Sequence, residues 1–267
     1  MRSGPERWAR EQPVRDIDAL AYEGFSRGAE SYDRARPGYA VEAVDWMCVR
    51  LGITRESLVL DLGAGTGKLA LLLRERSASR VIAVEPVPEM REIAAVHGLG
   101  VLDGSAESLP VADDSVDAVV CGEAFHWFDG KRALHEIGRA LVPGGGLGLL
   151  WNLHLWDRNA SWVQAIERLL APHADRRTET RYSSGRWQGA FERDRHWTRL
   201  EGRSFAHEQR LEPAALVDHV ASVAFVAALP DRQRAELLAE VGRVVADLPA
   251  PVTIPYRTDA YVSTTVS

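Results

Sequence analysis

The sequence predicts an α/β fold with a doubly wound, mostly parallel sheet. Short apolar runs alternate with amphipathic helical segments between residues 58 and 151, which is typical of successive βαβ units. Glycine and proline clusters separate these segments. Because crossovers between parallel strands are right-handed, we expect helices to cover both faces of the sheet.

The N-terminal half supplies the expected core of the sheet. A short helical segment over residues 17–34 and a helix from Ala40 to Leu51 come first, and Gly52 ends the second. Strands are then expected at residues 58–60, 81–84, 101–102, 116–121 and 147–151. Helices between them are expected at residues 67–76, 89–97 and 131–141.

The alternation stops after Trp151. Helices are expected at residues 160–170, 213–229 and 231–247, whereas residues 172–199 lack a clear period. Residues 252–262 look like a final pair of strands broken at Pro255. We therefore expect the second half to decorate and close the sheet without forming an independent domain.

Composition excludes several classes of protein. The 267 residues are 46% hydrophobic and 26% charged, which is the balance of a globular chain. The net charge of −6 argues against nucleic-acid binding through bulk positive charge. Two distant cysteines, Cys48 and Cys121, argue against a disulfide framework or a four-ligand zinc site. With no apolar signal segment and no membrane-length apolar run, we expect a cytoplasmic protein without membrane or metal partners.

The strongest motif is the glycine-rich run VLDLGAGTGKLA after the first strand. A dinucleotide fingerprint counted from Gly63 needs glycine where Lys68 stands, and a phosphate loop needs Ser or Thr where Leu69 stands. Asp61 places a carboxylate near the turn, which repels phosphate and attracts an ammonium or sulfonium group. The motif therefore favours a ligand without phosphates, and a tight turn with no ligand is the simpler alternative.

Acidic residues follow the next two strands. Glu85 ends the second strand about 20 residues after the turn, where an acidic side chain accepts hydrogen bonds from ribose hydroxyls. Asp103, Ala106 and Glu107 follow the third strand and could border an adenine. A surface glutamate and a solvated loop are the alternatives for these positions.

Four ordered segments carry a resemblance to a known family. They are VLDLGAGTGKLA, VIAVEPVPEM, GSAESLPVADDSVDAVVCGEAFHWF and ALHEIGRALVPGGGLGLLW. The chain resembles the class I S-adenosylmethionine-dependent methyltransferases, and within them it is most similar to the methyltransferase type 11, trans-aconitate methyltransferase-like group. The segment YDRARPGY also resembles the N-terminal part of that group. The resemblance covers residues 25–152 and implies a Rossmann-like, seven-stranded, mostly parallel sheet with an antiparallel C-terminal strand and helical additions.

The resemblance implies an S-adenosylmethionine site. The glycine turn and the end of the fourth strand would border the methionine part, Glu85 would hold the ribose, and the loop after the third strand would line the adenine site. Two N-terminal residues would contact the cofactor from a lid. The expected cofactor-binding residues are Asp61, Gly63, Ala64, Gly65, Gly67, Glu85, Pro86, Asp103, Ala106, Glu107, Gly122, Glu123, Tyr32 and Arg36.

His126 is the candidate catalytic residue. It follows the fourth strand, and an ordinary imidazole titrates in the range that suits a general base. Methyl transfer needs a base only when the acceptor carries a proton, since much of the rate can come from positioning. The alternative is that the surrounding aromatic run packs on the next helix while His126 holds a loop by hydrogen bonds.

Together these patterns predict a methyltransferase that acts on a small molecule, most simply on oxygen, as a monomer or homodimer. A non-methylating member of the fold, such as a cyclase or a cofactor-binding regulatory protein, is the main alternative. A nicotinamide-dependent oxidoreductase and a nucleic-acid methyltransferase are further alternatives.

The expected organisation is a mobile arm over residues 1–24 followed by a single methyltransferase domain over residues 25–267. Within that domain we expect a cofactor-binding core at 25–152, a variable acceptor-site and lid region at 153–250, and a closing strand at 251–267.

Overall fold

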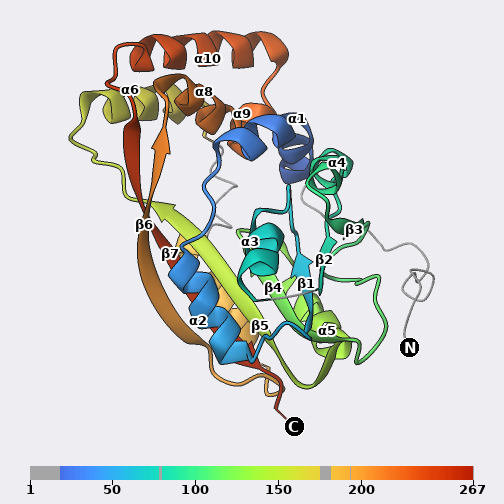
Figure 1. Ribbon diagram of the computed structural model, residues 1–267. Coiled ribbons are helices and arrows are strands. Elements are labelled where there is room, and N and C mark those ends of the chain that lie inside the picture. Colours follow the sequence, from blue (N-terminus) through green and yellow to red (C-terminus); the bar gives the residue numbers. More distant parts are fainter. Residues whose placement is uncertain (1–18, 78–79, 175–181, 193, 267) are drawn as a thin grey trace.

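The computed structural model describes residues 19–77, 80–174, 182–192 and 194–266. A seven-stranded sheet with the order β3-β2-β1-β4-β5-β7-β6 runs through the molecule (Figure 1). The first five strands are parallel, whereas β7 is antiparallel to both β5 and β6. The strands are β1 Leu58–Leu62, β2 Arg80–Val84, β3 Gly100–Leu102, β4 Val116–Gly122, β5 Leu141–His154, β6 Glu201–Leu211 and β7 Val252–Thr264. The predicted doubly wound fold is confirmed.

Helices cover both faces of the sheet, so its central strands are apolar on both sides. Alternate β1 residues face opposite layers: Leu60 packs with Ile137 of α5, and Val59 packs with Met47 of α2. The helices are α1 Ala19–Ala35, α2 Val41–Leu51, α3 Lys68–Arg76, α4 Pro88–Val96, α5 Gly130–Ala140, α6 Ser161–Leu170, α7 Gly189–Glu192, α8 Pro213–Ala221, α9 Ala224–Ala227 and α10 Asp231–Val245.

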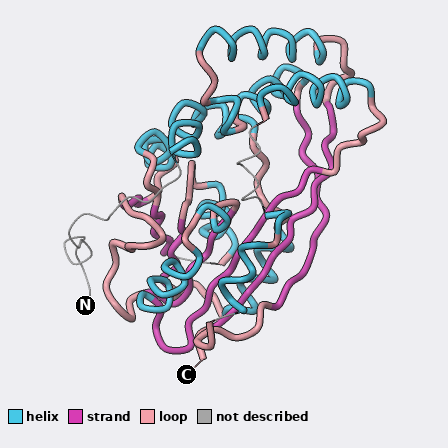
Figure 2. Tube along the Cα trace, turned by 180° about the vertical axis from the view of Figure 1, so that it is seen from behind, coloured by secondary structure: helices cyan, strands magenta, loops and turns pink. Residues whose placement is uncertain are grey.

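A separate layer of helices lies beyond the carboxyl ends of the strands (Figures 1 and 2). Helices α6, α8, α9 and α10 share one apolar cluster, to which the ends of β6 and β7 contribute Leu211 and Ile254. Helix α1 packs against α8 and α9 and also against α4. We call α1, α6, α8, α9 and α10 the cap. The cap therefore covers the edge of the sheet at which ligands of open α/β folds bind.

The N-terminal boundary differs from the expected one. Helix α1 begins at Ala19, so residues 19–24 belong to a helix and not to an arm. Residues 1–18 of the expected arm lie outside the described residues. The helix expected over 213–229 is divided into α8 and α9, because the chain turns at Ser222 and Val223.

The expected final strand pair is wrong. Residues 252–264 form the single strand β7, and its second partner is β6, which the sequence pattern did not reveal. Pro255 is tolerated because it lies just beyond the β5 ladder, which ends at the pair of His154 and Tyr256. Strand β6 was missed because it is a charged edge strand whose exposed and partly buried residues lack an apolar run.

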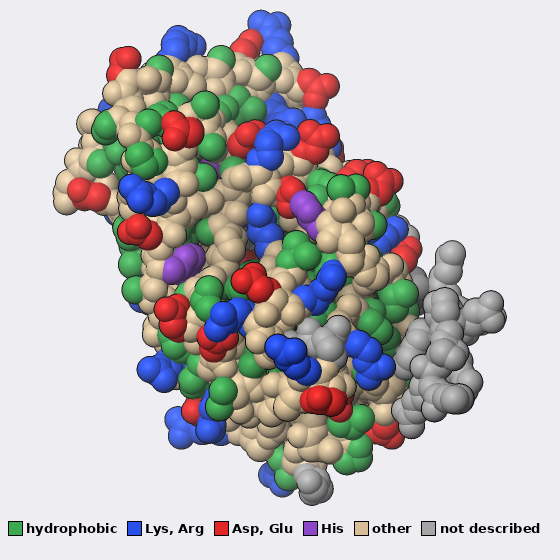
Figure 3. All heavy atoms as spheres, viewed as in Figure 1, with side chains coloured by type: hydrophobic (Ala, Val, Ile, Leu, Met, Phe, Trp, Pro, Cys, Tyr) green, Lys and Arg blue, Asp and Glu red, His purple; other side chains and the backbone are tan. Residues whose placement is uncertain are grey.

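The face seen in Figure 3 carries acidic and basic side chains intermixed across the sheet layer and the cap. Charges of one sign do not gather into a broad patch on this face. Among the helices of the described ranges, not one combines the length and the apolar character that a bilayer crossing requires.

Candidate active site

A cavity opens at the carboxyl ends of β1, β2 and β4, beneath α1. The space within it, counted together with the solvent it opens onto, is about 760 Å³. It is lined by Phe25, Tyr32, Leu62, Gly63, Gly65, Glu85, Pro86, Val87, Met90, Gly104, Ser105, Ala106, Glu107, Gly122, Glu123, Ala124, Trp127 and Phe128. The cavity therefore brings together residues from five separate parts of the chain, and half of these residues are among those expected from the sequence.

The glycine turn forms the floor on the β1 side. Gly63 and Gly65 have φ values of 65° and 57°, in the left-handed region that favours glycine. A Cβ atom on Gly63 would lie 2.7 Å from the Cβ atom of Ala124, so a side chain there would also collide with the β4 side of the cavity. The Gly63 N–H donates to Val84 O at 2.8 Å, which ties the turn to the end of β2.

Two residues of the motif, Ala64 and Gly67, do not line the cavity. Gly67 instead lets α3 approach Leu99, since a Cβ atom there would lie 2.2 Å from the Leu99 Cδ1 atom. Its role in the structure is therefore helix packing.

Glu85 stands at the end of β2 and is buried, with its carboxylate on the cavity wall. One oxygen accepts the Gly65 N–H at 2.8 Å, and the other accepts the Val87 N–H at 2.9 Å. Burial raises the pKa of Glu85 to about 7. Because a carboxylate oxygen has two acceptor sites, each oxygen retains capacity for one further hydroxyl donor.

Asp61 lies beneath the turn and off the cavity wall, with no exposed surface. Neither of its oxygens has a hydrogen-bond partner of normal geometry among the described residues. Burial raises the pKa of Asp61 to about 7; the nearby backbone N–H of Ala70 opposes this shift in part, and the charge of Glu85 adds to it. A buried carboxylate without a partner is costly, and its chemistry fits a cationic group bound above it.

Glu123 contributes a third carboxylate from the end of β4. Its φ value of 58° is unusual for a residue other than glycine, and it turns the chain away from the strand direction. One oxygen accepts the Asn152 N–H, and the Glu123 N–H donates to Leu150 O at 2.9 Å. Burial raises the pKa of Glu123 to about 7, although the positive charge of Arg36 partly opposes this.

Tyr32 and Arg36 come from the end of α1 and the segment after it. Tyr32 lines the cavity, whereas Arg36 does not. The Arg36 guanidinium donates to the Ser222 Oγ atom at 2.8 Å and lies 5.6 Å from the centroid of the Tyr32 ring. Arg36 thus connects the cavity wall to α8 of the cap.

The loop after β3 forms the wall next to Glu85. Ala106 and Glu107 line it, but Asp103 instead pairs with Arg91 at 3.1 Å. Arg91 also donates to the Glu85 main-chain oxygen at 2.8 Å, so this pair supports the cavity from outside. Glu107 accepts the Asp129 N–H at 2.9 Å, which joins the loop to the start of α5.

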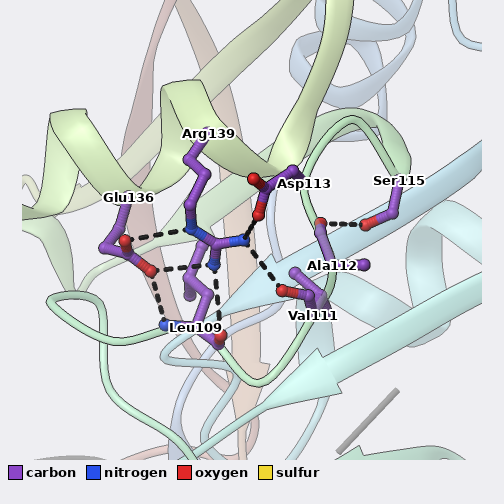
Figure 4. Close-up of polar contacts among 7 residues, drawn as sticks. All are labelled: Leu109, Val111, Ala112, Asp113, Ser115, Glu136 and Arg139. Carbon is purple, nitrogen blue, oxygen red and sulfur yellow. Dashed lines mark hydrogen bonds and ion pairs between the residues drawn. The ribbon is translucent and has the colours of Figure 1, made fainter. Parts of the chain in front are cut away.

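Arg139 of α5 fastens the far end of the same loop (Figure 4). It donates to the main-chain oxygens of Val111 at 3.0 Å and Leu109 at 3.3 Å, and it pairs with Glu136 at 2.9 Å. Glu136 accepts the Leu109 N–H at 3.1 Å. The pair therefore satisfies both backbone groups of Leu109 and fixes the loop on α5.

Most of the apolar residues that line the cavity were not predicted from the sequence. Phe25 of α1 meets Trp127 edge to face, with ring centroids 6.0 Å apart, although these residues are distant in sequence. Leu62 and Ala124 could have been found as chain neighbours of predicted residues. The other missed lining residues are Val87, Met90, Gly104, Ser105 and Phe128.

His126 lies in the short 3₁₀ helix Phe125–Trp127 and is not a lining residue of the cavity. The Trp151 indole N–H donates to the His126 Nδ1 atom at 3.0 Å. A neutral imidazole that accepts at Nδ1 carries its proton at Nε2. This geometry matches the loop-holding alternative for His126.

The described residues contain no group of three or more His, Cys, Asp or Glu side chains suited to holding a metal ion. The cavity instead offers carboxylates, backbone turns and apolar surface.

Comparisons with known proteins show which family the chain resembles. A family model for a methyltransferase domain matches residues 60–149. An uncharacterized methyltransferase of Mycobacterium bovis is 35% identical over 241 residues, which span 88% of this chain and 92% of that protein. A malonyl-[acyl-carrier protein] O-methyltransferase of Methylococcus capsulatus is 38% identical over 96 residues, covering 33% of this chain and 35% of that protein.

Solved structures share the fold. The YcgJ protein of Bacillus subtilis has a TM-score of 0.52 at 20% identity, covering 85% of this chain and 99% of that chain. A structure from Anaeromyxobacter dehalogenans has a TM-score of 0.62 at 22% identity, covering 85% of this chain and 97% of that chain.

The sheet order and the glycine turn define a Rossmann-like enzyme with its site at the carboxyl ends of the strands. A relative that matches most of the chain is itself named a methyltransferase. The chain belongs to the class I S-adenosylmethionine-dependent methyltransferase family and is an enzyme of that class. The trans-aconitate methyltransferase-like subgroup stays a prediction.

Proposed function

We propose that this chain binds S-adenosylmethionine in the cavity beneath α1 and transfers its methyl group to an oxygen atom of a small molecule. The observation that carries the proposal is Asp61, a buried carboxylate without a hydrogen-bond partner of normal geometry under a glycine turn. A cationic ligand would compensate this charge, whereas a phosphate would be repelled.

The residues present fit the cofactor. Glu85 would accept hydrogen bonds from both ribose hydroxyls, and Ala106 and Glu107 would border the adenine. The glycine turn and Glu123 would border the methionine end. When bound, the cofactor supplies a methyl group activated by a sulfonium.

The chain's own contribution is positioning and exclusion of water. Phe25 and Tyr32 cover the cavity from α1, and Trp127, which meets Phe25, completes the aromatic wall together with Phe128. Holding two reactants in line can recover on the order of 7–11 kcal/mol of barrier. That His126 acts as a base stays a prediction. The hydrogen bond that its Nδ1 atom accepts from the Trp151 indole N–H weighs against this role.

The proposal of a small-molecule acceptor rests on a partial relative, on the cap and on the charge of the chain. A partial relative is named as an O-methyltransferase, and residues 153–250, proposed as the acceptor-site and lid region, supply most of the cap. The net charge of −6 and the intermixed charges of Figure 3 favour a small molecule over nucleic acid. We propose a cytoplasmic monomer or homodimer. The non-methylating alternative is not favoured, because methyltransferase relatives span most of the chain.

Calorimetry with S-adenosylhomocysteine, the demethylated product, tests the proposal. Glu85→Gln removes a charged acceptor of two hydrogen bonds, so we expect binding to weaken by about 2–4 kcal/mol, or roughly 30- to 700-fold in Kd. Glu89→Gln, an exposed position on α4, is the matched control and should bind as wild type does. A folded wild-type chain that does not bind the product would refute the proposal.

A further inference from the structure

Lys68 stands where a dinucleotide-binding fingerprint would have its third glycine, and the proposed cofactor site gives this lysine no role. It is the first residue of α3, directly after the glycine turn. Its side chain is 24% exposed, and its Nζ atom donates to the main-chain oxygen of Asp33 at 2.7 Å. Asp33 is in the last turn of α1. The bond therefore joins the glycine turn to the helix that covers the cavity.

The Asp33 carbonyl needs this donor. The last four carbonyls of a helix lack partners unless the following residues supply N–H groups. The residue four positions after Asp33 is Pro37, which has no N–H. Lys68 supplies the donor that the proline cannot, and its positive charge suits the C-terminal end of a helix.

The Asp33 side chain adds a third element to the junction. Its Oδ1 atom lies 4.0 Å from the Lys68 Nζ atom, and its Oδ2 atom lies 3.0 Å from the Nε2 atom of His97. His97 follows the end of α4. One short segment of α1 is thus fastened to the start of α3 and to the end of α4.

The junction adjoins the cavity. Tyr32 precedes Asp33 and lines the cavity, and its ring carbon lies 3.9 Å from the position that a Cβ atom on Gly65 would take. Phe25, two turns earlier on α1, lines the same wall. A displacement of the end of α1 would therefore move the aromatic cover away from the glycine turn.

We propose that Lys68 is a positioning residue that holds α1 against the glycine turn, so that Phe25 and Tyr32 enclose the bound nucleoside. This inference rests on the proposed function, because it assigns α1 as the cover of the cofactor site. Lys68 itself does not line the cavity, so it acts through α1 and not by contact with the ligand.

The test compares Lys68→Met, which keeps the methylene stem and removes the donor, with Lys131→Met. Lys131 is the other lysine of the chain and is exposed at the start of α5. Calorimetry with S-adenosylhomocysteine on the full chain should show binding at least 10-fold weaker for Lys68→Met and unchanged for Lys131→Met. Asp33→Asn keeps the carbonyl acceptor and should lose less than 3-fold.

Hydrogen exchange separates positioning from general stability. In the ligand-free chain, Lys68→Met should raise the exchange of α1 amides selectively and leave those of α5 unchanged. The inference is overturned if α1 exchange does not rise, or if Lys68→Met binds the product within 2-fold of Lys131→Met. If the wild type does not bind the product, the proposed function fails, and the exchange measurement still decides whether Lys68 holds α1.

Discussion

Above about pH 7, Asp61→Asn should stabilise the ligand-free protein while weakening cofactor binding. The carboxyl has no exposed surface, and burial raises its pKa from 3.8 to about 7. A folded-state pKa above the unfolded value means that the folded chain holds this proton more tightly. Asp61 therefore does not lower the free energy of unfolding below about pH 4. Its cost grows as the pH rises towards 7 and stays constant above that pH.

The size of the effect follows from the shift. Each pKa unit corresponds to about 1.4 kcal/mol, so a shift of roughly three units costs the wild type about 4 kcal/mol above pH 7. About 3 kcal/mol of this is lost between pH 5 and pH 8. Asparagine does not titrate, so the stability of Asp61→Asn relative to wild type should rise by about that amount over the same interval. A buried amide without a partner subtracts about 1–3 kcal/mol at every pH.

Urea unfolding followed by tryptophan fluorescence at pH 5, 6, 7 and 8 measures the difference. Asp247→Asn, which removes a charge from an exposed position after α10, is the control and should show no such trend. A stability difference between Asp61→Asn and wild type that does not change with pH would contradict the assignment of Asp61 as an uncompensated buried carboxyl.

Two further substitutions test the walls of the cavity. Gly122→Ala places a Cβ atom 2.2 Å from the Tyr39 hydroxyl, so the free energy of unfolding measured in urea should fall by about 1–3 kcal/mol. An unchanged value would show that Tyr39 moves aside freely. Arg139→Met leaves the Leu109 carbonyl and the Glu136 carboxylate without their donor, which should cost about 1–3 kcal/mol in stability. It should also weaken S-adenosylhomocysteine binding in calorimetry, and an unchanged affinity would show that the loop does not need this anchor.

The predictable part of the site is local in the chain. Gly63 and Glu85 were found because each stands directly after a strand, and Gly65 because it belongs to the turn that begins at Gly63; the ends of parallel strands meet at one edge of the sheet. The pattern could not show that Asp103 turns outward to Arg91, since that depends on a helix packed outside the loop. Nor could it show that His126 accepts a hydrogen bond from Trp151 on the neighbouring strand.

The sequence by itself determined the alternation of elements, the parallel core of the sheet and the glycine-rich turn after the first strand, because these depend on periodicity and on the spacing of residues close in the chain. Only the tertiary structure decided which side chains enclose the cavity. Phe25 meets Trp127, and Lys68 donates a hydrogen bond to Asp33. Both contacts join segments that are distant in the chain and come together only when the cap folds over the sheet. Such contacts are governed by packing between distant elements, which leaves no periodic signal in the sequence.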